Sequence, residues 1–186
     1  MQDNHRRADL IASGALAAWC ALAACAPAQP TATVESATTS VKVDPKTATI
    51  AQAEVVGVSI RVEQVSDLLG AEFHLQFDPT VLEVIDDDTL IEGVQIAHGE
   101  LLHADLVPEN RVDNAAGTID YAIVQINRAA IAGSGVLATI HFKGKAPGVA
   151  LITFRSVPAA PQGIVLADSR GKAISGAAET GSLTVE

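Results

Sequence analysis

The residue types that carry out catalysis are present in this chain, but they do not form a catalytic arrangement. Ser134 lies in a Gly-Ser-Gly segment, yet the strand-turn-helix unit that presents a nucleophilic serine is missing around it. Aspartates and glutamates are plentiful, but they fall at outward strand positions or in loops and form no carboxylate pair in a cleft. We therefore expect a protein that is not an enzyme.

Histidines and acidic residues also fail to form a metal site. Four of the five histidines are scattered along the chain after residue 41: His74, His98, His103 and His141. None belongs to a His-Glu-x-x-His or similar ligand spacing. The run Asp86-Asp87-Asp88 could ligate calcium, which takes several oxygens, but its side chains alternate in direction and no EF-hand spacing follows. We expect a solvated loop there, and no metal or other cofactor held by this chain.

The clearest structural signal surrounds His74. In residues 72–77, Glu, His and Gln alternate with Phe, Leu and Phe. Side chains alternate between the two faces of a strand, so the three apolar residues share one face and the three polar residues the other. Asp78-Pro79 ends this strand, because proline cannot donate to a strand ladder. The apolar run at 81–84 predicts a second short strand against the same core.

The same alternation recurs in short stretches from about residue 41 onward, and no stretch holds a sustained helical period. The other expected strands lie within residues 41–43, 56–62, 99–107, 118–126, 136–142, 149–154, 164–166 and 183–185. Turns are expected at 67–70 and 133–135, and the strand within 99–107 should end before Pro108. Many short strands separated by turn residues predict an all-β fold, an antiparallel sandwich or jelly roll.

Composition narrows the classes of partner. The net charge is −10, which disfavours nucleic acid, because a phosphate-binding surface needs clustered lysines and arginines. Aromatic residues make up only 3 % of the chain, with one tryptophan, Trp19, and one tyrosine, Tyr121. Sugar rings stack on exposed aromatic side chains, so a planar platform for cellulose or chitin is not expected.

The N-terminal residues read as an export signal followed by a tether. Residues 1–25 combine a basic start with an apolar stretch too short to span a membrane comfortably. This stretch ends in Leu22-Ala23-Ala24-Cys25, which resembles the bacterial lipobox and predicts lipidation of Cys25. An ordinary secretory signal, with Cys25 incidental, is the alternative. Residues 26–40 predict a flexible linker rich in Pro, Thr, Ser and Ala, and residues 41–186 a folded domain. We expect an exported protein, either secreted or lipid-anchored outside the cytoplasmic membrane.

Taken in order, several segments resemble the cohesin domain family. Gly70-Ala71-Glu72-Phe73, Phe77-Asp78-Pro79 and Leu82-Glu83-Val84 together are similar to its signature. Later segments follow the order of the family: His98 to Leu102, Ile131 to Phe142, Pro147-Gly148, Ile152 to Phe154, and Gly181 to Val185. The resemblance covers roughly residues 41 to 186.

This resemblance implies a nine-stranded antiparallel jelly-roll sandwich that is related in fold to carbohydrate-binding modules. It implies a non-catalytic module whose partner is a calcium-dependent dockerin, with the calcium in the partner and a role in polysaccharide breakdown. Many cellulosomal cohesins hydrogen-bond dockerin through an Asn and an Asp at the positions of Gly70 and Glu72. Glu72 keeps an acceptor but Gly70 has no side chain, which is a departure from the standard cellulosomal pattern.

Strand parity and the resemblance together predict a partner-binding face. If Phe73 and Ile119 point inward, their strand neighbours of opposite parity point outward, and the resemblance places both strands on the sheet that meets dockerin. The predicted binding residues are Glu72, His74, Gln76, Asp120, Ala122, Val124, Ile126 and Leu137. An exposed apolar patch of this kind usually marks an interaction site, but a loop or the segment at 86–110 could equally cover it.

Two other functions remain open at this point. A carbohydrate-binding module could use a groove built from polar side chains, even without a flat aromatic platform. A structural domain of the cell envelope would need no partner, and a fully polar sheet face would favour it.

Overall fold

A computed structural model describes residues 38–186, and every regular element in this part of the chain is a β-strand. The strands are β1 (Ser40–Asp44), β2 (Thr47–Ile50), β3 (Val55–Gln76), β4 (Leu82–Val84), β5 (Ala97–His98), β6 (Leu106–Asp113), β7 (Thr118–Val124), β8 (Ile131–Gly144), β9 (Gly148–Phe154), β10 (Ile164–Asp168), β11 (Ala173–Ile174), β12 (Ala177–Glu179) and β13 (Gly181–Val185). With no helix in these residues, there is none long and apolar enough to cross a membrane.

The predicted all-β sandwich is confirmed, with two differences in detail. The structure divides the described residues into thirteen strands where nine were expected, because short segments such as β4 and β5 form strands of their own and β1 and β2 are separated at Pro45. Proline lacks the N–H that a continuous ladder needs. The sheet is also not wholly antiparallel, since β1 pairs with β12, and β2 with β13, in the parallel sense.

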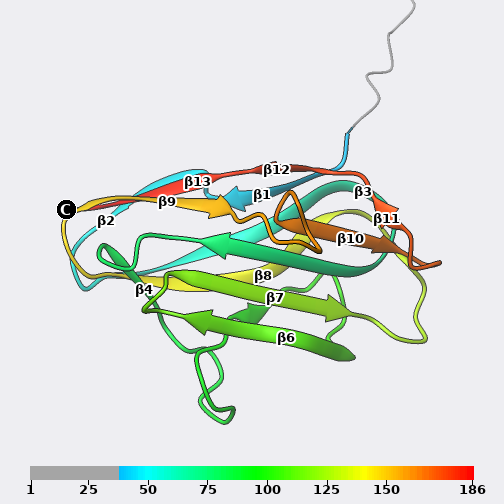
Figure 1. Ribbon diagram of the computed structural model, residues 1–186, viewed down its shortest axis with the longest axis horizontal. Coiled ribbons are helices and arrows are strands. Elements are labelled where there is room, and N and C mark those ends of the chain that lie inside the picture. The colour runs from blue at the N-terminus through cyan, green and yellow to red at the C-terminus, as the bar shows by residue number, and fades with distance from the viewer. Residues whose placement is uncertain (1–37) are drawn as a thin grey trace, which may run out of the picture. The chain divides into compact units, whose positions relative to one another are not determined.

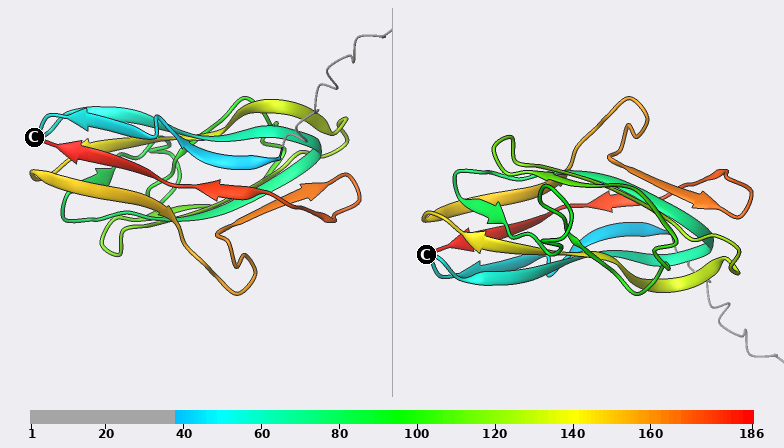
Figure 2. Two further views of the ribbon diagram at one scale, coloured as in Figure 1. Left: turned by 90° about the horizontal axis from the view of Figure 1, so that it is seen from above. Right: turned by 90° about the horizontal axis from the view of Figure 1, so that it is seen from below.

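The strands form two layers that are connected by one long strand (Figures 1 and 2). The first half of β3 pairs with β1 and β8, and β8 in turn pairs with β4 and β5. The second half of β3 pairs with β7 on one side and with β10 and β9 on the other, and β6 extends this layer beyond β7. A single continuous strand therefore contributes to both layers.

The turn expected at residues 67–70 is not formed. The chain instead bends within β3, where Gln64 and Asp67 have φ values of 53° and 61°. Left-handed backbone of this kind is uncommon outside glycine and lets a strand change direction locally. The pairing of β3 with β8 is irregular over the same residues, so the bend replaces the expected turn and carries the strand between layers.

The corner predicted around Asp78-Pro79 is confirmed. Phe73, Leu75 and Phe77 are buried in the core, β3 ends at Gln76, and β4 begins at Leu82. The Asp78 carboxylate accepts hydrogen bonds from the backbone N–H and the hydroxyl of Thr80, at 2.9 and 2.7 Å. An aspartate that accepts hydrogen bonds from the residue two positions later stabilises such a turn, in addition to the effect of Pro79.

Two other strand boundaries were predicted wrongly. The strand expected within 99–107 is β6, which begins only at Leu106 and contains Pro108. Its pairing with β7 shifts register between Leu106 and Glu109, and such a bulge tolerates proline. The break expected at 133–135 is absent, because β8 runs from Ile131 to Gly144 through these residues.

Candidate functional site

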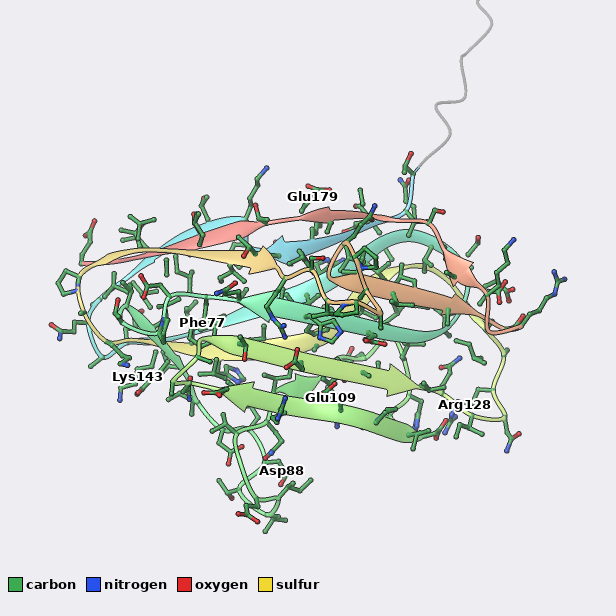
Figure 3. The ribbon with its side chains drawn as sticks, viewed as in Figure 1. Phe77, Asp88, Glu109, Arg128, Lys143 and Glu179 are labelled. Carbon is green, nitrogen blue, oxygen red and sulfur yellow. The ribbon has the colours of Figure 1, made fainter. Side chains whose placement is uncertain are left out.

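The outward sides of β3, β7 and β6 form one continuous surface, which we call the outer face (Figure 1). Strand register sets two rows across it: Asp120 lies between His74 and Arg111, and Ala122 lies between Glu72 and Glu109. Phe73, Tyr121 and their inward neighbours are buried, so residues of opposite parity point away from the core. Glu109, on β6, is labelled on this face in Figure 3.

His74 is the centre of a charged cluster on the outer face. Its Nδ1 lies 2.6 Å from Asp120 Oδ1, and its Nε2 lies 2.7 Å from Glu72 Oε1. The residue is only 6 % exposed, although its parity directs it outward. The predicted site residues Glu72, His74 and Asp120 are therefore brought into direct contact.

Two arginines complete this cluster. Arg155, which follows β9, donates from Nη2 to Asp120 Oδ1 at 2.5 Å, and Arg111 on β6 places Nη2 3.6 Å from Asp120 Oδ2. The backbone also fixes Arg155, since its N–H donates to the carbonyl of His74 at 2.8 Å. We call Glu72, His74, Asp120, Arg111 and Arg155 the charge cluster.

The surroundings of His74 favour its protonated form. Burial acts to lower the pKa of His74, but the hydrogen bonds that its ring donates to Asp120 and Glu72, and the negative charge of both, outweigh it and raise this pKa above its usual value. With the ring protonated, two carboxylates face two cations, His74 and Arg155. These four groups sum to zero and are held together by hydrogen bonds, and the charge of Arg111 is balanced by Glu109 beside it.

The other end of the outer face is apolar. Val124 lies opposite Leu106 in the sheet register; Val124 follows Ala122 on β7, and Leu106 precedes Glu109 on β6. Leu106 is 48 % exposed and Ile126 is 46 % exposed, while Ala122 and Val124 are half-buried. We call Leu106, Ala122, Val124 and Ile126 the aliphatic patch. Since β6 lies beside β7 and not over it, residues 106–110 do not cover this patch.

Gly70 shapes the border of the aliphatic patch by having no side chain. It lies opposite Val124, and a Cβ added to Gly70 would lie 3.3 Å from Val124 Cγ2 and 3.4 Å from the carbonyl of Ile123. Such distances are tighter than ordinary contact, so Val124 occupies space that a larger residue at position 70 would need. Where a polar side chain is expected from the resemblance, this surface is aliphatic.

The prediction that Leu137 points to the outer face is wrong. Leu137 lies on β8, which pairs with the first half of β3 and not with β7, and it is 1 % exposed. Val136 and Ala138 pair with consecutive residues of β3, Arg61 and Ile60, so Leu137 is the extra residue of a bulge. A bulge breaks the alternation on which the prediction depended.

The other predicted residues take separate positions. Gln76 is exposed at the end of β3, and Ile126 follows β7, where its N–H donates to Asp105 Oδ2 at 2.9 Å. Arg128 contacts the same Asp105 carboxylate, and these hydrogen bonds hold the pKa of Asp105 well below its usual range. This exposed ion pair borders the aliphatic patch.

The residues considered for catalysis or metal binding take part in local structure. Ser134 Oγ accepts the backbone N–H of Gln64 at 2.9 Å, beside the bend in β3. Asp86 Oδ1 accepts the N–H groups of Asp88 and Gln95, which orders the loop after β4. Within residues 38–186, no three His, Cys, Asp or Glu side chains are grouped so that they could hold a metal ion.

Sequence reasoning missed Arg111, Arg155 and Leu106. Arg111 and Leu106 lie on β6, whose start and bulge were not predicted, so their parity could not be assigned. Arg155 directly follows a predicted strand, but only the tertiary pairing places it beside His74. The expected signal peptide, the linker and Cys25 lie outside the described residues, apart from the end of the linker.

Comparison with known proteins identifies the fold family. The family profile of the cohesin domain matches residues 39–182. A search of curated proteins finds no match.

Solved structures give the same picture at low sequence identity. A type II cohesin domain from the cellulosome of Acetivibrio cellulolyticus has a TM-score of 0.66 at 21 % identity, covering 79 % of this chain and 95 % of that one. A non-cellulosomal cohesin from Archaeoglobus fulgidus has a TM-score of 0.61 at 20 % identity, covering 81 % and 92 %. The structure of a type I cohesin–dockerin complex from Clostridium thermocellum contains a chain with a TM-score of 0.64 at 16 % identity, covering 81 % and 100 %.

These similarities cover the two layers and nearly the whole described sandwich. The family profile spans all strands from β1 to β12, including the strands of the outer face. The chain belongs to the cohesin domain family.

Proposed function

We propose that this chain is a non-catalytic binding module that docks a dockerin-type module on its outer face. The observation that carries the proposal is the pairing, on one sheet surface, of an open aliphatic patch with a rigid charge cluster. Apolar side chains that stay exposed beside ordered polar groups are the usual anatomy of a protein-binding surface.

Family membership supports this proposal. Relatives of similar fold from Clostridium thermocellum and Acetivibrio cellulolyticus were solved as complexes with dockerin-containing chains. The aliphatic patch would supply the apolar contact, while Glu72, Gln76 and Glu109 would form the polar border. Because Gly70 offers no hydrogen bond, the partner would meet Val124 there instead of a polar side chain.

The remaining parts of the proposal concern chemistry and location. The module itself would need no cofactor, and any calcium would belong to the dockerin. Export, with lipidation of Cys25, would tether the module outside the cytoplasmic membrane, and its partner would bring an enzyme of polysaccharide breakdown to the surface. A direct sugar platform is disfavoured, since Phe73, Phe77, Tyr121 and Phe142 are buried and Phe154 is partly buried against the core.

The test is capture of purified dockerin modules from the same genome by residues 38–186, with and without calcium. In the part of the chain that the structure describes, the buried core runs from Val41 to Val185, and residues 36–186 form one compact unit of contacts. Two variants locate the surface: Leu106→Asp on the aliphatic patch, and Val55→Asp on the other layer as the control. The two side chains are matched in exposure, at 48 % and 49 %.

We expect calcium-dependent capture that Leu106→Asp weakens at least tenfold, because it places a charge in an apolar contact. Val55→Asp should bind like the unchanged chain. Equal binding by both variants would remove the outer face from the proposal, and failure to capture any dockerin would contradict the function itself.

A further inference from the structure

With Glu72 and Asp120 both ionised, the contacts of His74 are satisfied together only when both of its ring nitrogens carry a proton. Each nitrogen lies within 2.7 Å of a carboxylate oxygen, Asp120 Oδ1 on one side and Glu72 Oε1 on the other. A carboxylate only accepts hydrogen bonds, and a neutral imidazole donates from one nitrogen alone. The geometry therefore describes an imidazolium held between two carboxylates.

The two carboxylates are held unequally. The Asp120 side chain is 10 % exposed and also meets Arg155 and Arg111. The Glu72 side chain is 35 % exposed, and in the part of the chain that the structure describes its one polar contact is His74. If the ring loses its second proton, the contact to Glu72 is the one that can open, since Asp120 is fixed by its arginines.

Charge balance makes this contact sensitive to a partner. With His74 protonated, Glu72, Asp120, His74 and Arg155 sum to zero, and the next pair outward, Arg111 and Glu109, also cancels. A basic side chain that approaches Glu72 then meets little net attraction and is repelled by the imidazolium. Loss of the ring proton leaves a net charge of −1 beside the aliphatic patch and frees Glu72 to accept from that basic group.

We propose that His74 is a positioning residue that couples docking to proton release: the partner presents a lysine or arginine to Glu72, and the proton displaced from His74 passes to solvent. This inference rests on the proposed function and specifies the partner's chemistry. The partner would combine an apolar strip for the aliphatic patch with a basic residue opposite Glu72. A raised pKa in the free chain agrees with a ring that holds its proton until docking.

Linkage gives the direction of the effect. When binding releases one proton, affinity rises with pH by at most about tenfold per pH unit, across the range in which His74 titrates. Replacing His74 by glutamine keeps a polar side chain but removes the titration, so the affinity of that variant should not follow pH over this range.

The experiment is calorimetric titration of residues 38–186 with the dockerin captured above, in buffers of different ionisation enthalpy between pH 5.5 and 8.5. We expect up to one proton released by the unchanged chain and by a control variant, His141→Gln, whose histidine lies on the other layer beside Asp87. His74→Gln should release fewer protons and lose most of the pH dependence.

Nitrogen NMR of the free chain gives a readout without a partner. The His74 ring should be protonated at both nitrogens at pH 6, and Glu72→Gln should lower the pH at which it titrates. A neutral ring at pH 6, or binding without proton release, would overturn the coupling alone. Failure to bind any dockerin would overturn the proposed function, and the coupling with it.

Discussion

At the residue scale, His74 makes the stability of the sandwich depend on pH. Its pKa is raised in the folded chain, so its protonated form stabilises the fold. That contribution is complete below the unfolded pKa of about 6.5 and is lost as pH rises through the higher folded value. We expect the free energy of unfolding of the unchanged chain to exceed that of His74→Gln by more at pH 6 than at pH 9.

Urea unfolding of residues 38–186, followed by circular dichroism across this pH range, measures the difference directly. The control is His141→Gln, whose side chain is 40 % exposed, and which should keep the pH dependence of the unchanged chain. If the difference in unfolding free energy between the unchanged chain and His74→Gln stayed constant with pH, protonation of His74 in the charge cluster would not stabilise the fold.

The residues around His74 show which parts of the site could be predicted from the sequence. Alternation in residues 72–77 was enough to direct Glu72, His74 and Gln76 away from the core. It could not indicate that His74 and Asp120 are both buried, because Asp120 also contacts Arg111 on β6 and Arg155 after β9, which are distant in sequence. Charged residues that come into contact only through tertiary pairing cannot be identified as partners from the local sequence.

At the scale of elements, alternation predicted the direction of side chains correctly in regular strands and wrongly at bulges. β3 after its bend and β7 pair without a register shift from Gly70 to Gln76, and their predicted inward residues are buried. β8 contains a bulge, and the prediction for Leu137 failed there. β6 contains another at Pro108, where the strand was expected to have ended.

The bulge makes Leu137 a core residue, and this can be tested by truncation. Leu137→Ala removes a fully buried side chain, and we expect a loss of about 2–5 kcal/mol of unfolding free energy. Leu106→Ala is the matched control on the exposed aliphatic patch and should change stability by roughly 0.5 kcal/mol or less. Denaturant unfolding of both variants measures the two losses of unfolding free energy. Similar losses would contradict the placement of Leu137 in the core.

At the scale of the whole molecule, the fold class followed from the sequence but the division into layers did not. Short alternating stretches with turn residues between them indicated a sandwich. That β3 is one strand of 22 residues serving both layers depends on the left-handed residues Gln64 and Asp67, which neither composition nor periodicity predicts.

The net charge of −10 should also affect how fast a partner arrives. An acidic module attracts a basic docking surface over a distance set by salt, so the association rate constant should fall by roughly tenfold between 50 and 500 mM NaCl. The dissociation rate should change much less, because apolar contacts govern it. Stopped-flow mixing with the captured dockerin measures both, and an association rate that ignores salt would argue against a basic partner.

The pairing of β1 has a mechanical consequence. β1 is hydrogen-bonded on one side to β3 over five residue pairs and on the other to β12 over three. Tension applied to the chain ahead of Ser40 pulls along β1, at right angles to these bonds, so they share the force and must yield together in shear. A module that is anchored through its N-terminal side and pulled by a docked partner would therefore resist unravelling from the end that bears the tension.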